Sequence, residues 1–130
     1  MIISFKKSKI AEKKILMTLN KRNIEFICLA GFMKILSNNF IKKFKGRIVN
    51  IHPSYLPKYK GLNTSVRALR NNEKFSGCTV HHVSAKLDSG KIILQKKVKI
   101  TRNETEISLH RKIIKEEHKL YPAAIRKIFN

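Results

Sequence analysis

The sequence contains few acidic residues, few cysteines and no long apolar run, and each shortage excludes something. Only 8 of the 130 residues are Asp or Glu, against 29 Lys and Arg, so the formal net charge is +21. A membrane-spanning helix needs roughly 18 or more consecutive apolar residues, and no such run occurs. The opening MIISFKKSKIAEKK lacks a small-residue cleavage site, which excludes a secretory signal peptide. These absences predict a cytoplasmic protein with no membrane segment.

The two cysteines, Cys28 and Cys78, each lie alone in an apolar, strand-like run. We interpret both as small buried hydrophobic residues in a reducing compartment, not as a disulfide. No two of the five histidines combine with a cysteine into a convincing metal site, so we predict no bound metal. His81 and His82 are adjacent on a predicted strand and point to opposite faces. We interpret them, like His118, as structural or surface residues.

The positive charge is easily over-interpreted. A surplus of Lys and Arg favours binding to polyanions such as nucleic acids. Here the positive residues are mostly Lys and are scattered through every segment, and no basic stretch is interleaved with aromatic residues that would stack on bases. The composition therefore argues against nucleic-acid binding as the main function, whereas a small anionic substrate would benefit from the same field.

Two hydrophobic patterns alternate along the chain. Helical spacing predicts helices over residues 8–21, over 37–46 with Ser37 or Asn38 as the cap, over 63–73, and over a long final segment. That last helix would start at a capping box, Thr101 with Glu104 or Asn103 with Glu106. Strands are predicted over residues 24–32, 47–52, 77–85 and 91–100, the first two buried. The alternation predicts one α/β domain over residues 1–130, its first two strands parallel and its last two open to antiparallel pairing.

The stretch RIVNIHPSYLPKYKG, residues 47–61, places an amide and an imidazole where a strand must end. Asn50 and His52 are two positions apart, so an extended chain presents both on one face. In open α/β sheets, ligands bind beyond the carboxyl ends of the strands. An amide can hold a carbonyl oxygen that becomes negative, and an imidazole exchanges a proton near neutral pH.

A carboxylate to orient this imidazole can come only from a few positions. Asp88 is the only aspartate, and it lies in KLDSG, a turn between two predicted strands that can return it to the same end of the sheet. Asn50, His52 and Asp88 together suit attack on an activated acyl carbon. The alternative is a capping Asn, a buried His and a turn Asp without a shared function.

Longer words of the sequence resemble phosphoribosylglycinamide formyltransferase. LAGFMKILS, GRIVNIHPSYLPKYKG, CTVHHVSAKLDSGKIILQKKV and EEHKLYP follow in the family's order and near its spacing, and the likeness runs from about residue 5 to the end. The resemblance implies a formyltransferase-type, Rossmann-like open sheet that is mostly parallel. It also implies transfer of a formyl group from 10-formyltetrahydrofolate, the co-substrate, to the amine of glycinamide ribonucleotide in purine biosynthesis, with no metal.

The resemblance assigns roles position by position. Asn50 would bind the formyl oxygen, His52 in its charged form would stabilise the oxyanion, and Asp88 would support His52 and relay the proton through water. Folate would be bound by Phe32, Met33, Lys34, Ile35, Leu36, Ile41, Val49, Ser84, Ala85, Lys86 and Leu87. The ribonucleotide would be bound by Gly31, Ile51, Pro53 and Glu117. For residues 33–36, ordinary core packing is the alternative.

The chain also departs from the family. Its members begin with a strand and a Gly-, Asn- and Ser-rich loop that holds the substrate phosphate at a helix N-terminus, and neither has a counterpart here. We therefore expect an N-terminally truncated domain whose strand 24–32 has an unpaired edge, and a second chain that supplies the missing half. The alternatives are a non-catalytic remnant or half of a split enzyme, another folate-dependent formyltransferase or deformylase, and a basic nucleic-acid-binding module.

Overall fold

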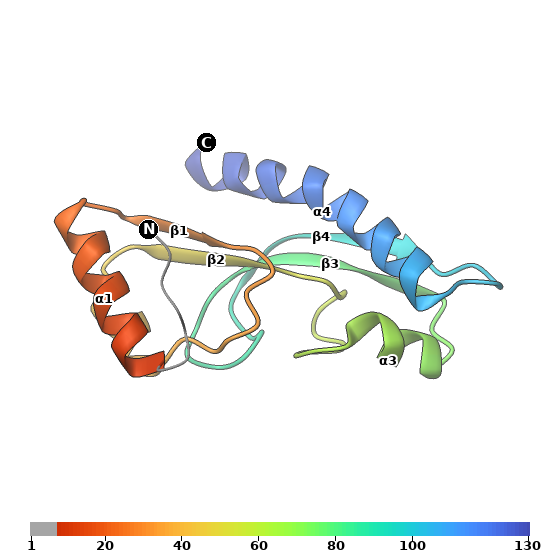
Figure 1. Ribbon diagram of the computed structural model, residues 1–130. Coiled ribbons are helices and arrows are strands. Elements are labelled where there is room, and N and C mark those ends of the chain that lie inside the picture. The colour runs from red at the N-terminus through yellow and green to blue at the C-terminus, as the bar shows by residue number, and fades with distance from the viewer. Residues whose placement is uncertain (1–7) are drawn as a thin grey trace.

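The computed structural model describes residues 8–130, and in this part of the chain helices and strands alternate (Figure 1). The helices are α1 (Ser8–Lys21), α2 (Asn38–Lys43), α3 (Thr64–Arg70) and α4 (Glu106–Phe129). The strands are β1 (Phe26–Leu29), β2 (Arg47–His52), β3 (Phe75–His82) and β4 (Ile92–Lys99). Each predicted element is present, with ends shifted by a few residues. Residues 1–7, which belong to the predicted domain, lie outside the described residues.

The described strands form one open mixed sheet in the order β1-β2-β3-β4. β1 and β2 are parallel, with Leu29 opposite Asn50, whereas β2–β3 and β3–β4 are antiparallel. The α/β class and the parallel first pair are therefore confirmed, but the expectation of a mostly parallel sheet is wrong. The reason is local: β3 and β4 are joined by a short turn-rich connection, which antiparallel neighbours allow and a parallel crossover does not.

The two faces of the sheet are covered differently. On one face, Ile48 of β2 packs with Leu16 of α1 and with Phe40 of α2, and Ile27 and Leu29 of β1 join this cluster. On the other face α4 lies along the sheet (Figure 1). The residues that pack there, across two adjoining clusters, are Cys78, Val98, Leu109 and Ile113, and then Ile51, Val80 and Ala124. Alternate side chains of β2 therefore point to opposite faces, which leaves Asn50 and His52 on the face opposite α4.

β1 is less buried than its sequence suggests. Its four residues are half-buried or exposed, and Cys28 is exposed, while Cys78 on β3 is completely buried. The expectation that both cysteines are buried is thus wrong for Cys28. β1 is the edge strand of the sheet, and α4 packs mainly against β3 and β4, so the face that carries Cys28 is only partly covered. Neither cysteine of the described chain forms a disulfide.

The helix caps follow the sequence in one case and not in another. Ser37 caps α2, because its hydroxyl accepts from the Phe40 N–H, as expected. α4 begins later than expected, with Thr105 as the cap and a reciprocal bond to Ser108. Neither predicted capping box, Thr101 with Glu104 or Asn103 with Glu106, caps α4, although Thr101 and Glu104 do bond to each other in the turn before the helix.

Glu104 carries a further contact in this turn. The Lys112 ammonium, together with the hydroxyl of Ser108, holds the pKa of Glu104 at about 2. The charged carboxylate therefore stabilises the start of α4 from just outside it. No helix within residues 8–130 is both long enough and apolar enough to cross a bilayer.

Candidate active site

The site begins at the carboxyl ends of β1 and β2. Tyr121 of α4 ties these ends together, because its hydroxyl donates to the carbonyl of Leu29 at 2.7 Å and lies 3.2 Å from that of Val49. Burial raises the pKa of Tyr121 above its ordinary value, so this hydroxyl stays protonated and remains a donor. The last residues of β2 then present Asn50 and His52 on the face opposite α4. His52 is only 6% exposed.

A loop of residues 53–63 follows β2 and folds back over His52. The Nε2 atom of His52 lies 2.8 Å from the carbonyl oxygen of Tyr59. A carbonyl only accepts, so Nε2 must carry the proton of this hydrogen bond. Pro53 starts the loop, and its carbonyl accepts from the Thr64 hydroxyl at the start of α3. The loop therefore contacts the imidazole through its backbone, not through a side chain.

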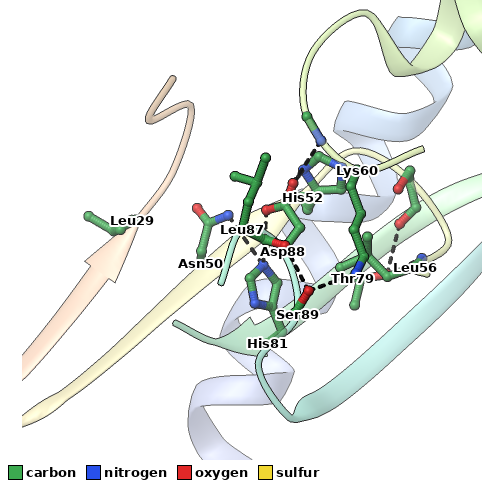
Figure 2. Close-up of polar contacts among 12 residues, drawn as sticks. Leu29, Asn50, His52, Leu56, Lys60, Thr79, His81, Leu87, Asp88 and Ser89 are labelled. Atoms are coloured by element: carbon green, nitrogen blue, oxygen red, sulfur yellow. Dashed lines mark hydrogen bonds and ion pairs between the residues drawn. The ribbon is translucent and has the colours of Figure 1, made fainter. Parts of the chain in front are cut away.

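Asp88 comes from the connection between β3 and β4, as the sequence predicts. Figure 2 shows its carboxylate between the rings of two histidines. Oδ2 lies 3.6 Å from Nδ1 of His52 and accepts from the Gly61 N–H at 2.8 Å, while Oδ1 lies 3.7 Å from Nε2 of His81. The Asp88 side chain is 8% exposed. The described structure thus brings Asn50, His52 and Asp88 to one place.

Glycine at position 90 is required by this connection. A Cβ at Gly90 would lie 1.6 Å from the carbonyl oxygen of His82, well inside contact distance. Asp88 itself has a φ of 45°, in the left-handed region that Asp tolerates better than most residues. Both features show that a tight backbone path carries the carboxylate to the site.

His81 is a site residue that sequence reasoning missed. It pairs with Asn50 across the antiparallel strands β2 and β3, so the two side chains are cross-strand neighbours. Nε2 of His81 lies 3.4 Å from Nδ2 of Asn50, and Nδ1 lies 2.9 Å from the His82 carbonyl. Only the register of β2 against β3 shows that His81 lies opposite Asn50. Without this register, a histidine on β3 cannot be distinguished from a core residue.

The protonation state of His81 follows from its surroundings. It is 2% exposed, and burial lowers its pKa below the ordinary value, although the His82 carbonyl and Asp88 act in the other direction. The neutral ring donates from Nδ1 to His82 and accepts at Nε2 from the Asn50 amide. Nε2 of the neutral His81 ring carries no proton for Asp88, whose other neighbours are Nδ1 of His52 at 3.6 Å and the Gly61 N–H.

The side-chain amide of Asn50 can form further hydrogen bonds. Its Nδ2 has one hydrogen directed to His81 and a second available, and its Oδ1 is buried with no hydrogen-bond partner among the described residues. Buried polar atoms are normally paired. An unpaired acceptor beside an available donor suits a ligand that carries both a carbonyl oxygen and an amine.

An apolar pocket opens next to Asn50 and Asp88. It lies between the end of β1, the 32–36 segment, α2 and the connection after β3. Predicted folate residues that line it are Phe32, Lys34, Ile35, Leu36, Ile41, Ser84, Lys86 and Leu87. Leu29, His81 and Val83 line it as well and were not predicted. Figure 2 shows Leu29 and Leu87 on either side of Asn50.

Three predicted folate residues do not line this pocket. Met33 is 77% exposed, Ala85 is exposed, and Val49 is completely buried. Val49 alternates with Asn50 along β2, so its side chain points to the α4 face. Met33 has no contact in the pocket because the neighbouring Phe32 and Lys34 face inwards instead.

The predicted substrate residues are spread around the end of the sheet. Gly31 follows β1 with a φ of 60° and open space around it, and Pro53 starts the loop beside His52. Ile51 packs with Val80 and Ala124 on the α4 face, so only its backbone faces the site region. Glu117 lies on α4, half-buried, and burial raises the pKa of its carboxyl. Within residues 8–130 it has no hydrogen bond or ion pair that joins it to Asn50, His52 or Asp88.

Metal ligands do not gather in the part of the chain that the structure describes. No group of three or more His, Cys, Asp or Glu side chains there has the arrangement of a metal site. The two histidines beside Asp88 are held in hydrogen bonds to backbone carbonyls and to Asn50.

An α/β sheet that places an amide, an imidazole and a carboxylate beside an apolar pocket at its strand ends is typical of enzymes that act on a carbonyl carbon. The sequence matches the formyl transferase family over residues 3–125. Because this match covers nearly the whole sequence, the chain belongs to the formyl transferase family.

Curated relatives and solved structures agree with this assignment. The trifunctional purine biosynthetic protein adenosine-3 of Chironomus tentans is 49% identical over 108 residues, which are 83% of this chain and 8% of that protein. The human protein of the same name is 43% identical over 112 residues, which are 86% of this chain and 11% of that protein. The phosphoribosylglycinamide formyltransferase of Bacillus halodurans superposes with a TM-score of 0.90 at 38% identity and covers 96% of this chain. The enzyme of Brucella melitensis gives a TM-score of 0.86 at 43% identity and covers 95%.

The chain spans only part of each of these proteins. It corresponds to 8% and 11% of the two curated relatives and to 64% of each of the two solved chains. The high TM-scores place the described elements in the formyltransferase arrangement. The activity of the complete relatives does not follow from that arrangement alone.

Proposed function

We propose that this chain acts in formyl transfer as a phosphoribosylglycinamide formyltransferase. The donor would be 10-formyltetrahydrofolate and the acceptor the amine of glycinamide ribonucleotide. The observation that carries the proposal is the convergence of Asn50, His52 and Asp88 beside the apolar pocket. The likeness to solved phosphoribosylglycinamide formyltransferases supports it, because it extends over the strands and connections that carry these three residues.

In this proposal the amine nitrogen attacks the formyl carbon and the carbonyl oxygen gains negative charge. The free Nδ2 hydrogen of Asn50 and the charged ring of His52 stabilise that oxyanion. Preorganised donors of this kind lower a barrier by about 3–4 kcal/mol each when they meet charge that develops in the transition state. The buried, unpaired Oδ1 of Asn50 accepts from the attacking amine and helps to orient it.

The reaction must also move one proton. The amine loses a proton as the new C–N bond forms, and the folate nitrogen takes one as its bond to the formyl carbon breaks. In this proposal Asp88 carries this proton through water, and its contacts to His52 and the Gly61 N–H beside the pocket support that role. Its charge also stabilises the imidazolium of His52 while the oxyanion exists.

The pocket suits the flat ring of a reduced folate. Leucine and isoleucine side chains line its walls, and Lys34 and Lys86 bring positive charge for an anionic ligand. We propose that the lining residues predicted from sequence bind folate and that Gly31, Pro53, the Ile51 backbone and Glu117 bind the ribonucleotide. Met33, Val49 and Ala85 have less support as folate-binding residues, since none of them lines the pocket.

The first experiment is formyl transfer from 10-formyltetrahydrofolate to glycinamide ribonucleotide by the purified chain, with His52→Ala alongside. We expect the variant to lose roughly a hundredfold or more of the rate, because it removes the charge that stabilises the oxyanion. His118→Ala, an exposed histidine of α4, is the matched control and should keep full activity. Product from both variants alike would overturn the assigned role of His52.

A second chain stays a prediction within this proposal. The outer edge of β1 pairs with no strand in the described part of the sheet, and unpaired edges invite another strand. If the chain binds folate but forms no product, a polypeptide that carries the part of the solved relatives with no counterpart here should restore the transfer in trans. A single domain over residues 1–130 and a cytoplasmic location likewise remain predictions.

A further inference from the structure

We propose that Glu73, through the side chain of Tyr59, is a positioning residue that holds the backbone of the 53–63 loop against His52 and Asp88. Glu73 lies between α3 and β3, and its carboxylate binds Lys58 and Tyr59, not His52 or Asp88. The expected effect on the formyl-transfer rate rests on the proposed function, whereas the expected effect on the structure of the loop does not.

The loop reaches the site through two backbone groups. The Tyr59 carbonyl binds Nε2 of His52 at 2.8 Å, and the Gly61 N–H binds Oδ2 of Asp88 at 2.8 Å. The Tyr59 carbonyl binds the ring nitrogen of His52 that does not face Asp88, whereas the Gly61 N–H binds the Asp88 oxygen that faces His52, so both members of the pair are held by the loop. Anything that shifts residues 59–61 therefore moves the imidazole and the carboxylate together.

Tyr59 does not hold this position by its own backbone preference. Its φ is 57°, in the left-handed region, which costs a bulky residue about 1–2 kcal/mol. Such strained residues persist only when the surroundings hold them, and they are common beside functional sites. The restraint must therefore come from the side chain or from neighbouring contacts.

The side chain of Tyr59 is held at its far end. Its hydroxyl donates to Oε1 of Glu73 at 2.8 Å and accepts from Nδ2 of Asn71 at 3.1 Å. The guanidinium carbon of Arg67 lies 5.2 Å from the centre of the ring, within the range of a cation–π contact. Arg67 also donates to the carbonyls of Lys60, at 2.6 Å, and Leu62, so it holds the backbone on both sides of Gly61.

We call these four residues, Tyr59, Arg67, Asn71 and Glu73, the clasp. Arg67 belongs to α3 and the other two anchors to the segment between α3 and β3, so the clasp joins the site loop to α3 and to the connection that leads into β3. The Lys58 ammonium binds the same oxygen of Glu73, and together with Tyr59 it keeps the carboxyl charged by lowering its pKa. A charged acceptor makes the stronger hydrogen bond to the phenol.

Three variants separate the parts of the clasp. Tyr59→Phe removes only the phenolic hydroxyl and keeps the ring under Arg67. Glu73→Ala removes the acceptor, and Glu73→Gln keeps an acceptor without the charge. Glu25→Ala is the matched control. Glu25 is exposed and precedes β1, at the end of this strand that is far from the site, and its side chain has no polar partner among the described residues.

The decisive measurement is NMR of the purified chain with no substrate present. In the native chain, the ¹⁵N shifts of His52 should show Nε2 protonated, and the Gly61 amide should exchange slowly. Tyr59→Phe and Glu73→Ala should weaken the hydrogen bond from His52 Nε2 to the Tyr59 carbonyl, which shifts that ¹⁵N resonance, and should speed Gly61 exchange about fivefold or more, since each variant loses a bond worth about 1 kcal/mol. Glu73→Gln should lie between them and the native chain, and Glu25→Ala should match the native chain.

Kinetics then test the consequence for catalysis. Misplacement of catalytic groups can cost up to about a hundredfold, so we expect kcat to fall roughly tenfold or more in Tyr59→Phe and Glu73→Ala. The KM for the folate donor should stay unchanged, because no clasp residue lines the pocket. Native NMR behaviour in both variants would overturn the clasp even in an active enzyme. A native chain that shows no transferase activity, either alone or with the complementing polypeptide, would overturn the proposed function and leave the NMR result to decide the clasp.

Discussion

The two faces of the sheet differ in how they use apolar residues. Under α4, the side chains of Cys78, Leu109 and Ile113 are completely buried. Around the pocket on the other face, Ile35 is 66% exposed and Leu87 is 46% exposed. Exposed apolar side chains that line a concave site are available to a ligand, whereas those under α4 are already used to stabilise the fold. The face under α4 therefore serves as the scaffold and the opposite face carries the site.

The difference between the faces is largest for isoleucine truncation. Ile113→Ala should lower the free energy of unfolding by about 2–5 kcal/mol, because it opens a cavity in the completely buried α4 cluster. Ile35→Ala should change it by no more than about 0.5 kcal/mol and instead weaken folate binding. Urea denaturation and folate titration of both variants check this. Equal stability losses would show that Ile35, like Leu36, is part of the core.

A smaller loss of stability is expected in the connection between β3 and β4, which carries Asp88. Gly90→Ala forces the backbone away from the His82 carbonyl, which should cost about 1–3 kcal/mol. The formyl-transfer rate should fall by a larger factor than the folding equilibrium constant, since Asp88 lies two residues away. Thermal denaturation and formyl-transfer rates separate the two effects. Gly61 offers the contrast: a Cβ there meets no atom within 4 Å, and only its φ of 81° opposes substitution.

A pH effect on stability should arise on the site face from His81. Burial lowers the pKa of His81 below its ordinary 6.5, so the unfolded chain binds a proton here that the folded chain does not. The contribution of His81 to stability is therefore complete above about pH 6.5 and is lost as the pH falls towards the pKa of the folded state. His81→Gln should make the decline in stability below pH 6.5 shallower. His110→Gln, at an exposed position of α4, should leave it as in the native chain.

The mildest test compares the two cysteines. Iodoacetamide should modify Cys28, which is exposed on β1, and leave Cys78 intact in the folded chain. Burial, with the nearby Glu117 and Glu116, raises the pKa of Cys78 to about 12, so almost no thiolate forms at neutral pH. Mass spectrometry of peptides after labelling, with and without urea, gives the result. Labelling of Cys78 without urea would mean that α4 opens readily from the sheet.

Sequence alone determined the order and type of the elements, because hydrophobic spacing reports which faces are buried. It also placed Asn50 and His52 on one face, since alternation in a strand is a local property, and Asp88 in the turn between the next two strands. The capping of α2 by Ser37 is equally local. These features need only the residues within one element and its ends.

Tertiary structure decided the rest. The partner of each strand is set by packing and connection length, so the antiparallel pairing of β2 with β3, the exposure of Cys28 and the pairing of His81 with Asn50 could not be seen in the sequence. The same holds for Tyr59, whose backbone carbonyl binds His52 while its hydroxyl binds Glu73. Contacts between residues far apart in the chain depend on strand register and loop path, and neither leaves a periodic signal in the residues themselves.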